Sequence, residues 1–344
     1  MFRRTFLQLS LALRKDRLDQ VEQILKTATE SGSVLSATAV ARQGKDERRW
    51  VFGKTRAADP VYLLASITKP MTVTGLMVLV DRGEVKLGDP VRKFIPEFHG
   101  EGRDAVLVKH LLTHTSGLPD MLPDNEALRK RHAPLADFVA GTCRVPLLFA
   151  PGSQCKYQSM GILLAAEIAE RITKTKLREW LKQAVFDPLG MKSTALGLGQ
   201  HKIPDTEQCQ APNNDDWNWN SPYWRDLGAP WGGAHATAGD VLRFLESFLT
   251  PTGKVVKPET ARAMLTDQNA GLNEAWGLGF MVNGAHFSKA CSAGTFGHWG
   301  STGTVCWADP KTGTRLALLT TKPADQSRAS VLGPVSDAVA ESAA

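Results

Sequence analysis

The sequence predicts an α+β fold in which an antiparallel sheet, flanked by helices, is built from both ends of the chain. Segments with the composition of strands occur near the N-terminus, at 34–42 and 48–52, and again between residues 277 and 320. The chain between these two groups, over 76–210, reads as helices and loops with dense proline and glycine. Strands at both ends around a helical middle indicate one sheet domain with an inserted, mainly helical domain.

This organisation divides the chain into three predicted parts. Residues 1–15 form a signal-like or disordered segment, residues 16–75 and 211–344 form the sheet domain, and residues 76–210 form the helical insert. A chain of 344 residues with 42% hydrophobic residues can bury a substantial core in one elaborate domain or two.

The composition argues against several classes of function. The net charge is +6, but the basic residues are scattered and no run of Lys and Arg exceeds three, which is typical of a solvated surface rather than a nucleic-acid interface. No segment approaches the roughly 18 apolar residues that span a membrane. The five cysteines are an odd count without a C-x-x-C pair, so we expect free thiols, with one bridge left open. The oligomeric state stays open as well.

The N-terminus resembles a degenerate twin-arginine export signal. Residues 2–8 read Phe-Arg-Arg-Thr-Phe-Leu-Gln, but the apolar core at 9–13 is shorter than the about 7–15 residues of a working signal. Arg14 and Lys15 follow at once, without a small-residue cleavage site. We expect the segment to be retained rather than cleaved, and both a cytoplasmic and a periplasmic location stay open.

The first elements of the sheet domain follow from hydrophobic periodicity. Residues 16–30 are predicted to form an amphipathic helix, because their apolar side chains recur on one helical face. The strand-like segments 34–42 and 48–52 are separated by Gln-Gly-Lys at 43–45, which suits a hairpin turn.

The segment 65–70, Ala-Ser-Ile-Thr-Lys-Pro, points to catalysis. A strand-like run at 61–64 leads into it, and an apolar stretch of helical length follows at 71–80. Ser66 and Lys69 are therefore expected on one face of the first helical turn. A serine hydroxyl becomes a nucleophile when a base takes its proton, and a lysine can be that base if burial lowers its pKa. The alternative is an ordinary serine at a helix start.

Further elements are expected along the rest of the chain. Helices are predicted at 135–142, 161–172, 238–249 and near Ser330. Strands are predicted at 277–282, 297–299, 304–307 and 315–320.

The stretch 149–159 carries a second piece of chemistry. A Pro-Gly turn precedes Tyr157, which lies just before a predicted helix. A tyrosinate can act as a base if positive neighbours lower its pKa, and Lys156 beside it would do so. The alternative is a packed tyrosine with a hydrogen-bonded hydroxyl.

A third stretch, 296–304, reads Phe-Gly-His-Trp-Gly-Ser-Thr-Gly-Thr. Glycine on both sides of a polar and aromatic pair lets another backbone or a ligand approach a strand closely. Its N–H groups can then face a developing oxyanion. The alternative is a weak edge strand broken by glycine.

These three stretches, in this order, resemble the serine β-lactamase-related hydrolases: class C β-lactamases, D-alanyl-D-alanine peptidases and family VIII carboxylesterases. Three further pieces match, namely Lys-His-Leu-Leu-Thr-His-Thr-Ser-Gly-Leu at 109–118, Phe-Asp-Pro-Leu-Gly-Met at 186–191 and Trp-Gly-Gly at 231–233. The resemblance covers about residues 20–335 and implies a β-lactamase/transpeptidase-like fold.

The resemblance implies a role for each matching residue. Ser66 is expected to be the acylated nucleophile, Lys69 its helix partner and Tyr157 the tyrosine of the family. The oxyanion hole would be the backbone N–H groups of Ser66 and Ser301.

Two departures from the β-lactamase pattern bear on the substrate. Ser159 stands where class C β-lactamases have asparagine, and His298, Trp299 and Gly300 occupy the place of the Lys-Thr-Gly strand motif. Because the missing asparagine and lysine help to hold a β-lactam, an esterase or peptidase is expected rather than an efficient β-lactamase. A histidine at 298, with an ordinary pKa near ~6.5, is also expected to change the electrostatic field at the site as pH varies.

Two other motifs are interpreted as structural. The literal Lys-Thr-Gly at 311–313 follows Asp-Pro and is predicted to be a hairpin tip. The second Ser-x-x-Lys, from Ser153 to Lys156, follows Pro-Gly and is predicted to be a loop.

Neither a metal nor another cofactor is expected. His110 and His114 are four residues apart, but no carboxylate stands in register with them, so His114 is interpreted as part of a turn. The cluster Trp217, Trp219, Trp224 and Trp231, interleaved with polar residues, suits the mouth of a pocket better than plain core.

The sequence therefore predicts a serine hydrolase that cleaves a small-molecule ester, amide or peptide through an acyl-enzyme, without a nucleic-acid partner. One alternative is a true class C-type β-lactamase. Another is a catalytically silent module that binds cell-wall peptide or a protein partner, which the presence of Ser66, Lys69 and Tyr157 disfavours. Acyl transfer to an acceptor other than water is not separated from hydrolysis by the sequence.

Overall fold

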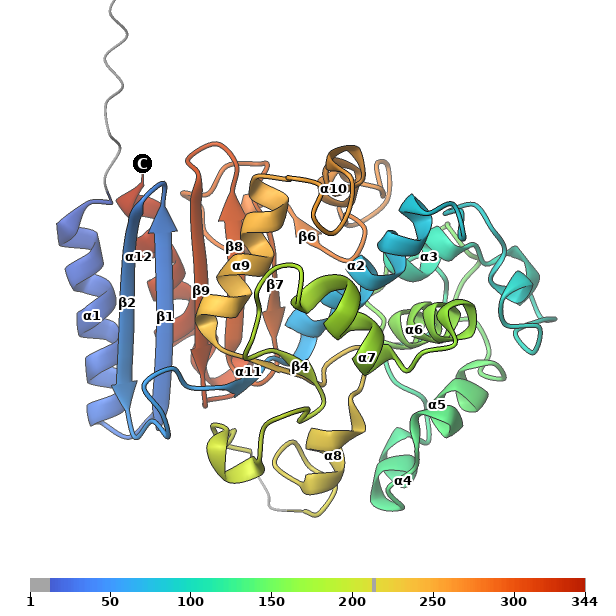
Figure 1. Ribbon diagram of the computed structural model, residues 1–344, viewed down its shortest axis with the longest axis horizontal. Coiled ribbons are helices and arrows are strands. Elements are labelled where there is room, and N and C mark those ends of the chain that lie inside the picture. The colour runs from blue at the N-terminus through green and yellow to red at the C-terminus, as the bar shows by residue number, and fades with distance from the viewer. Residues whose placement is uncertain (1–12, 212–214, 344) are drawn as a thin grey trace, which may run out of the picture.

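The computed structural model describes residues 13–211 and 215–343, so the signal-like residues 2–8 lie outside the described part of the chain. The central element is a six-stranded antiparallel sheet with the strand order β2-β1-β9-β8-β7-β6 (Figure 1). Its strands are β1 (Ser36–Gln43), β2 (Asp46–Gly53), β6 (Met281–Val282), β7 (Phe296–Gly300), β8 (Thr304–Asp309) and β9 (Thr314–Thr320). This confirms the predicted α+β fold, in which both ends of the chain build one antiparallel sheet.

Helices cover both faces of this sheet. Successive residues of a strand point to opposite faces, and in β9 both sets are apolar. Leu316 and Leu318 pack in a cluster with α1 (Lys15–Glu30) and α12 (Gly333–Ser342), whereas Ala317 and Leu319 belong to the cluster that contains α9 (Ala238–Leu249). The central strands are therefore held between two helical layers.

A mainly helical region lies beside the sheet, with α2 (Thr68–Asp81) at its centre (Figure 1). Residues 68–79 of this helix are all buried, and a helix that is apolar on every side must be enclosed by other elements. The helices α6 (Met160–Thr173) and α7 (Leu177–Leu181) pack against it. In turn, α3 (Val108–Leu112) and α5 (Leu135–Thr142) pack on α6, and α4 (Asn125–Lys130) packs on α5.

A small second sheet lies between these two regions. It has the order β3-β5-β4 and consists of β3 (Tyr62–Leu63), β5 (Ala234–Ala236) and β4 (Ala195–Leu196). The third predicted strand, at 61–64, thus pairs here rather than in the main sheet, and it delivers the chain directly to α2. The division into a sheet domain and an insert at residues 76–210 stays a prediction.

The structure differs from the predicted elements in two respects, a shortened strand and several additional short helices. The strand expected over 277–282 is confined to β6, because Gly279 has a φ of +80° and the N–H of Gly277 bonds to the carbonyl of Phe280 at 3.0 Å, which makes a turn. Six short helices of the described chain were not predicted, namely α3, α4, α7, α8 (Pro222–Leu227), α10 (Pro258–Leu265) and α11 (Ala324–Ser327).

The interpretation of Lys-Thr-Gly at 311–313 as a hairpin tip is confirmed. Asp309 and Thr314 pair across the end of strands β8 and β9, and Gly313 has a φ of +70° in the turn between them. In the part of the chain that the structure describes, no helix combines the length and the apolar character of a membrane span.

Candidate active site

Ser66 lies in a short 3₁₀ turn, Ala65–Ile67, at the entrance to α2. The chain just before it is tied to the turn between β7 and β8, because the hydroxyl of Thr302 donates to the carbonyl of Leu63 at 2.7 Å and that of Thr304 donates to Leu64 at 2.9 Å. These bonds hold the C-terminal strands against the turn that carries Ser66.

Gly300, at the end of β7, permits this close approach. A Cβ atom at this position would overlap the carbonyl oxygen of Leu64 and the hydroxyl of Thr304. Only glycine therefore lets the strand lie so close to the chain before Ser66. Ser301, which follows it, lines the same cavity as Ser66.

Lys69 is the first polar partner of Ser66. Its Nζ atom is 3.1 Å from the Ser66 Oγ and 3.0 Å from the carbonyl oxygen of Trp231. The side chain lies in the buried first turn of α2, and the residue is only 1% exposed. Burial lowers the pKa of Lys69 to about 7, against the opposing effect of the negative charge of Asp120.

The carbonyl that receives Lys69 is itself fixed. The hydroxyl of Thr72 donates to the carbonyl of Pro230 at 2.7 Å, and the N–H of Ala234 donates to the hydroxyl of Thr68 at 3.0 Å. These bonds fasten the segment 230–234 to the first turns of α2. The amino group of Lys69 is thus positioned beside the serine.

Tyr157 lies across Lys69, with its ring centre 4.6 Å from the Nζ. Burial raises the pKa of Tyr157 above its ordinary range, although a hydrogen bond with the Ser66 side chain opposes this. The expectation that Lys156 lowers this pKa is wrong, because Lys156 is exposed at the surface. Tyr157 is therefore a neutral phenol at physiological pH.

A network around His114 holds the loop that carries Tyr157. His114 Nδ1 accepts the N–H of Gln158 at 3.2 Å, and the Gln158 side chain accepts a hydrogen bond from Ser116 at 2.5 Å and donates one to the carbonyl of His110 at 3.0 Å. The His114 ring also lies 4.7 Å from the Tyr157 ring. His114 thus serves as part of the supporting turn.

Ser159 donates a hydrogen bond to Asp120 Oδ1 at 2.6 Å. Sequence reasoning missed Asp120, which lines the cavity and whose charge acts on Lys69. The one available signal was that Asp120 lies two residues beyond the matching piece 109–118. No spacing rule marks such a loop carboxylate as part of a site.

His298 lies behind Tyr157 and outside the cavity lining. Its ring centre is 6.0 Å from that of Tyr157 and 5.8 Å from that of Trp276, and the residue is only 2% exposed. Its Nδ1–H donates to the Trp299 carbonyl. Burial, together with the charge of Lys69, lowers the pKa of His298 to about 3. The expected change of charge at His298 near neutral pH is therefore corrected: the imidazole stays neutral.

The cavity in front of Ser66 has a volume of about 330 Å³. It brings together the predicted residues Ser66, Tyr157, Ser159, Ser301, Trp219, Trp224 and Trp231. Sequence reasoning missed other lining residues, among them Asp120, Met121, Asn125, Arg129 and Thr302. Trp217 is not in the lining, but its ring centre lies 5.1 Å from the Arg129 guanidinium.

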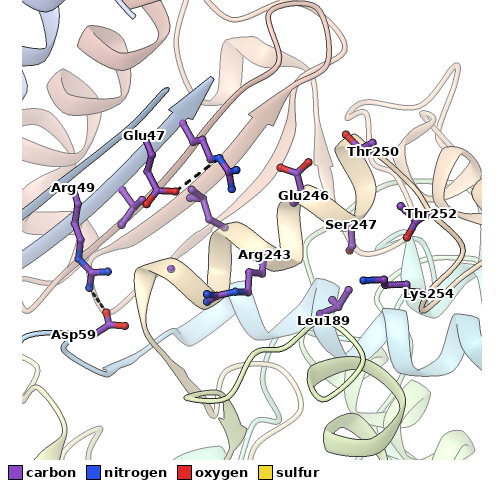
Figure 2. Close-up of a pocket in the computed structure, with 14 residues that line it drawn as sticks. Glu47, Arg49, Asp59, Leu189, Arg243, Glu246, Ser247, Thr250, Thr252 and Lys254 are labelled. Carbon is purple, nitrogen blue, oxygen red and sulfur yellow. Dashed lines mark hydrogen bonds and ion pairs between the residues drawn. The ribbon is translucent and has the colours of Figure 1, made fainter. Parts of the chain in front are cut away.

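Another hollow, of about 410 Å³, lies between the β1–β2 hairpin and α9 (Figure 2). Much of its charge is neutralised within the protein, since Arg49 pairs with Asp59 and Arg42 with Glu47 (Figure 2). None of the predicted catalytic residues lines it. The cavity at Ser66 is therefore the candidate active site.

Comparisons with known proteins agree with this geometry. The family model described as Beta-lactamase matches residues 21–340. The chain is 29% identical over 336 residues to esterase EstB of Burkholderia gladioli, covering 86% of this chain and 82% of that protein. It is also 29% identical over 219 residues to the D-alanyl-D-alanine-carboxypeptidase/endopeptidase AmpH of Escherichia coli (strain K12), covering 58% of this chain and 53% of AmpH.

A solved structure confirms the fold that the resemblance implied. A penicillin-binding protein homologue from Caulobacter crescentus matches with a TM-score of 0.78 at 23% identity, over 96% of this chain and 99% of that chain. The likeness extends over nearly the whole of both chains, so the β-lactamase/transpeptidase arrangement includes the sheet and the helical region alike.

Proposed function

The chain belongs to the beta-lactamase family, and on that basis we propose that it is a serine hydrolase that forms an acyl-enzyme on Ser66 and cleaves an ester or amide bond. The observation that carries the proposal is the 3.1 Å contact between the Ser66 Oγ and the Nζ of the buried Lys69. A lysine with a pKa of about 7 is neutral in a large share of molecules at neutral pH. It can therefore take the Ser66 proton as the hydroxyl attacks.

Attack on the substrate carbonyl places a negative charge on its oxygen. The backbone N–H groups of Ser66 and Ser301 are the proposed donors to this oxyanion, because Gly300 lets the end of β7 lie against the chain before Ser66. The carbonyl then re-forms, and the bond to the leaving group breaks. The leaving group receives the proton held by Lys69, either directly or through the Tyr157 hydroxyl.

Water completes the reaction by attacking the acyl group on Ser66. Its proton passes to the neutral Lys69, and the Ser66 oxygen is protonated as the acid departs. Tyr157 acts in this scheme as a neutral phenol that relays protons, since burial disfavours its ionised form. No step calls for a metal or another cofactor.

The side chains around the site favour an ester, amide or peptide substrate over a β-lactam. The hydroxyl of Ser159 donates to Asp120, and His298 is buried and neutral. Neither residue therefore supplies the positive charge with which a strand lysine binds a β-lactam. The similarity to a protein named esterase and to one named carboxypeptidase/endopeptidase supports the same choice.

A labelling and substrate experiment tests the proposal. A p-nitrophenyl phosphonate should modify the protein once, and peptide mass spectrometry should place the adduct on Ser66. Short-chain p-nitrophenyl esters should be hydrolysed far faster than nitrocefin. An adduct on another residue contradicts the mechanism, and equal or faster turnover of nitrocefin favours the β-lactamase alternative. A chain that takes no adduct and turns over none of these substrates fits the silent binding module.

A further inference from the structure

Arg129 of helix α4 lines the same cavity as Ser66. Its guanidinium carbon lies 4.0 Å from the centre of the Trp224 ring and 5.1 Å from that of the Trp217 ring. One Nη atom donates to the carbonyl oxygen of Trp217 at 2.8 Å. Stacking on an aromatic face stabilises a cation and restrains its orientation. The protein therefore holds a positive charge against one wall of the cavity.

This charge has no carboxylate partner among the residues that the structure describes. The adjacent cations do have one, since Lys130 pairs with Glu126 and Arg131 pairs with Asp137. The Nε of Arg129 is buried without a hydrogen-bond partner in the same part of the chain. A guanidinium has five N–H donors. The Nε–H is buried and one Nη–H is bonded to Trp217, which leaves three Nη–H donors for a ligand.

Burial lowers the pKa of Arg129 from its ordinary value, and Tyr223 opposes this. A guanidinium nevertheless stays charged in proteins. The other ionisable groups of the described chain at the cavity are Asp120, which accepts the Ser159 hydroxyl, Lys69 beneath Ser66, and the neutral phenol of Tyr157. The lining of the cavity therefore carries one carboxylate and one guanidinium that are not paired with each other.

We propose that Arg129 binds an anionic group of the substrate, so that the preferred substrates are esters or amides that carry a carboxylate away from the scissile carbonyl. A guanidinium matches a carboxylate with two parallel hydrogen bonds, and partial desolvation strengthens that pair. Asp120 directs the anion toward the wall of Arg129 by repulsion. The inference rests on the proposed hydrolase function of Ser66, and Arg129 determines specificity without taking part in bond making.

Matched ester pairs test this proposal. One pair varies the acyl group, p-nitrophenyl pentanoate against mono-p-nitrophenyl glutarate, and the other varies the leaving group, phenyl acetate against 4-acetoxybenzoate. In at least one pair, Arg129→Gln should lower kcat/KM for the anionic ester by about 10- to 100-fold and change that of the neutral ester by less than about threefold. Arg129→Lys should recover part of the loss.

Arg131→Gln is the matched control, because it removes the same charge two residues away at an exposed ion pair. It should leave both esters of each pair unchanged. An equal loss for neutral and anionic esters in Arg129→Gln means that Arg129 only supports the tryptophan wall, and the proposal is then wrong. The proposal is also wrong if Arg129→Gln changes neither ester, while Ser66-dependent hydrolysis of the neutral esters upholds the hydrolase function.

A binding measurement tests, independently of turnover, whether Arg129 binds the carboxylate of a ligand. The anilides of glutaric acid, with one free carboxylate, and of pentanoic acid are titrated into Ser66→Ala while tryptophan fluorescence is recorded. The anionic anilide should bind at least about tenfold more tightly, and the added change Arg129→Gln should abolish the difference. Equal affinities for the two anilides overturn the proposal, whatever the catalytic activity of the chain.

Discussion

The chain contains the pattern Ser-x-x-Lys twice, and the two copies differ in every physical property that matters for catalysis. In the first, Ser66 lies in the 3₁₀ turn that leads into the buried helix α2 and Lys69 lies in the first turn of α2, with their polar atoms 3.1 Å apart. In the second, Ser153 lies in a loop and donates its hydroxyl to the carbonyl of Ala150 at 2.7 Å, while Lys156 is exposed.

The comparison teaches that the spacing alone carries no chemistry. A buried lysine loses hydration and therefore its proton more readily, whereas a lysine in water keeps it. The Ser153 hydroxyl donates to a backbone carbonyl, and a carbonyl oxygen is too weak a base to take its proton. The enclosure of α2, rather than the motif, makes one of the two serines a candidate nucleophile.

The largest expected difference between the two copies is in the serines. Ser66→Ala should lower kcat/KM for p-nitrophenyl butyrate by about 10⁴-fold or more, the scale seen when an acyl-forming serine is removed. Ser153→Ala should stay within a few-fold of the wild type. A large loss in Ser153→Ala with little change in Ser66→Ala would show that the nucleophile belongs to the second copy and that the proposal for Ser66 is wrong.

The lysines should differ in the same direction, with a smaller effect. Lys69→Met keeps an unbranched side chain of similar length and removes the base, so kcat/KM should fall by about 10²- to 10⁴-fold. Lys156→Met should have little effect on the same assay. Thermal unfolding of both variants serves as the check on folding. Retained activity in Lys69→Met would require another base for Ser66.

A third contrast concerns two glycines, Gly300 near the site and Gly313 in the literal Lys-Thr-Gly. Gly300→Ala should push β7 away from Leu64 and misplace the Ser301 N–H, with a loss of about 10²- to 10³-fold in kcat, as for removal of one oxyanion donor. Gly313→Ala meets no atoms but adopts a φ of +70°, so it should reduce stability modestly and leave kcat unchanged. Comparable kcat values for the two variants would contradict the role given to β7.

The smallest effect is a shift in pH dependence. The proposed mechanism uses neutral Lys69 as the base, so kcat/KM should rise with pH through a pKa of about 7. The charge of Asp120 raises this pKa, and Asp120→Asn should therefore move the acidic limb to lower pH. Ser159→Ala, which removes the hydrogen bond but keeps the charge, should not lower it. Profiles of kcat/KM against pH, measured from pH 5 to 10, should show no second inflection from His298, because its imidazole stays neutral over this range.

Local patterns predicted much of this molecule. The periodicity of 16–30 predicted α1 almost to the residue, and the glycine turn at 43–45 predicted the β1–β2 hairpin. The spacing of Ser66 and Lys69 also predicted that the two side chains meet, although Ser66 lies in the 3₁₀ turn before α2 rather than in the helix itself. These features depend on neighbours in the sequence, which a single chain displays.

The rest of the site depends on contacts between distant segments. Asp120 comes from a loop and Arg129 from a six-residue helix, and packing alone brings them to the cavity of Ser66. The pKa values of Tyr157 and His298 were misjudged for the same reason. Burial by other parts of the chain, rather than the adjacent residue, sets the charge state of both groups.

The pairing of β1 with β9 has a consequence for how the protein acquires its activity. Ala37 pairs with Thr320, so almost the whole chain separates the two edges that must meet. Contacts of such sequence separation form late and slowly, because a long loop must be closed first. During synthesis, the β1–β2 hairpin emerges long before β9, and the edge of β1 that later pairs with β9 stays unpaired until then. An unpaired strand edge can pair with another chain and so promotes aggregation. Ser301 is likewise synthesised long after Ser66, so an incomplete chain that ends before β7 (Phe296–Gly300) lacks one of the two N–H groups proposed for the oxyanion hole.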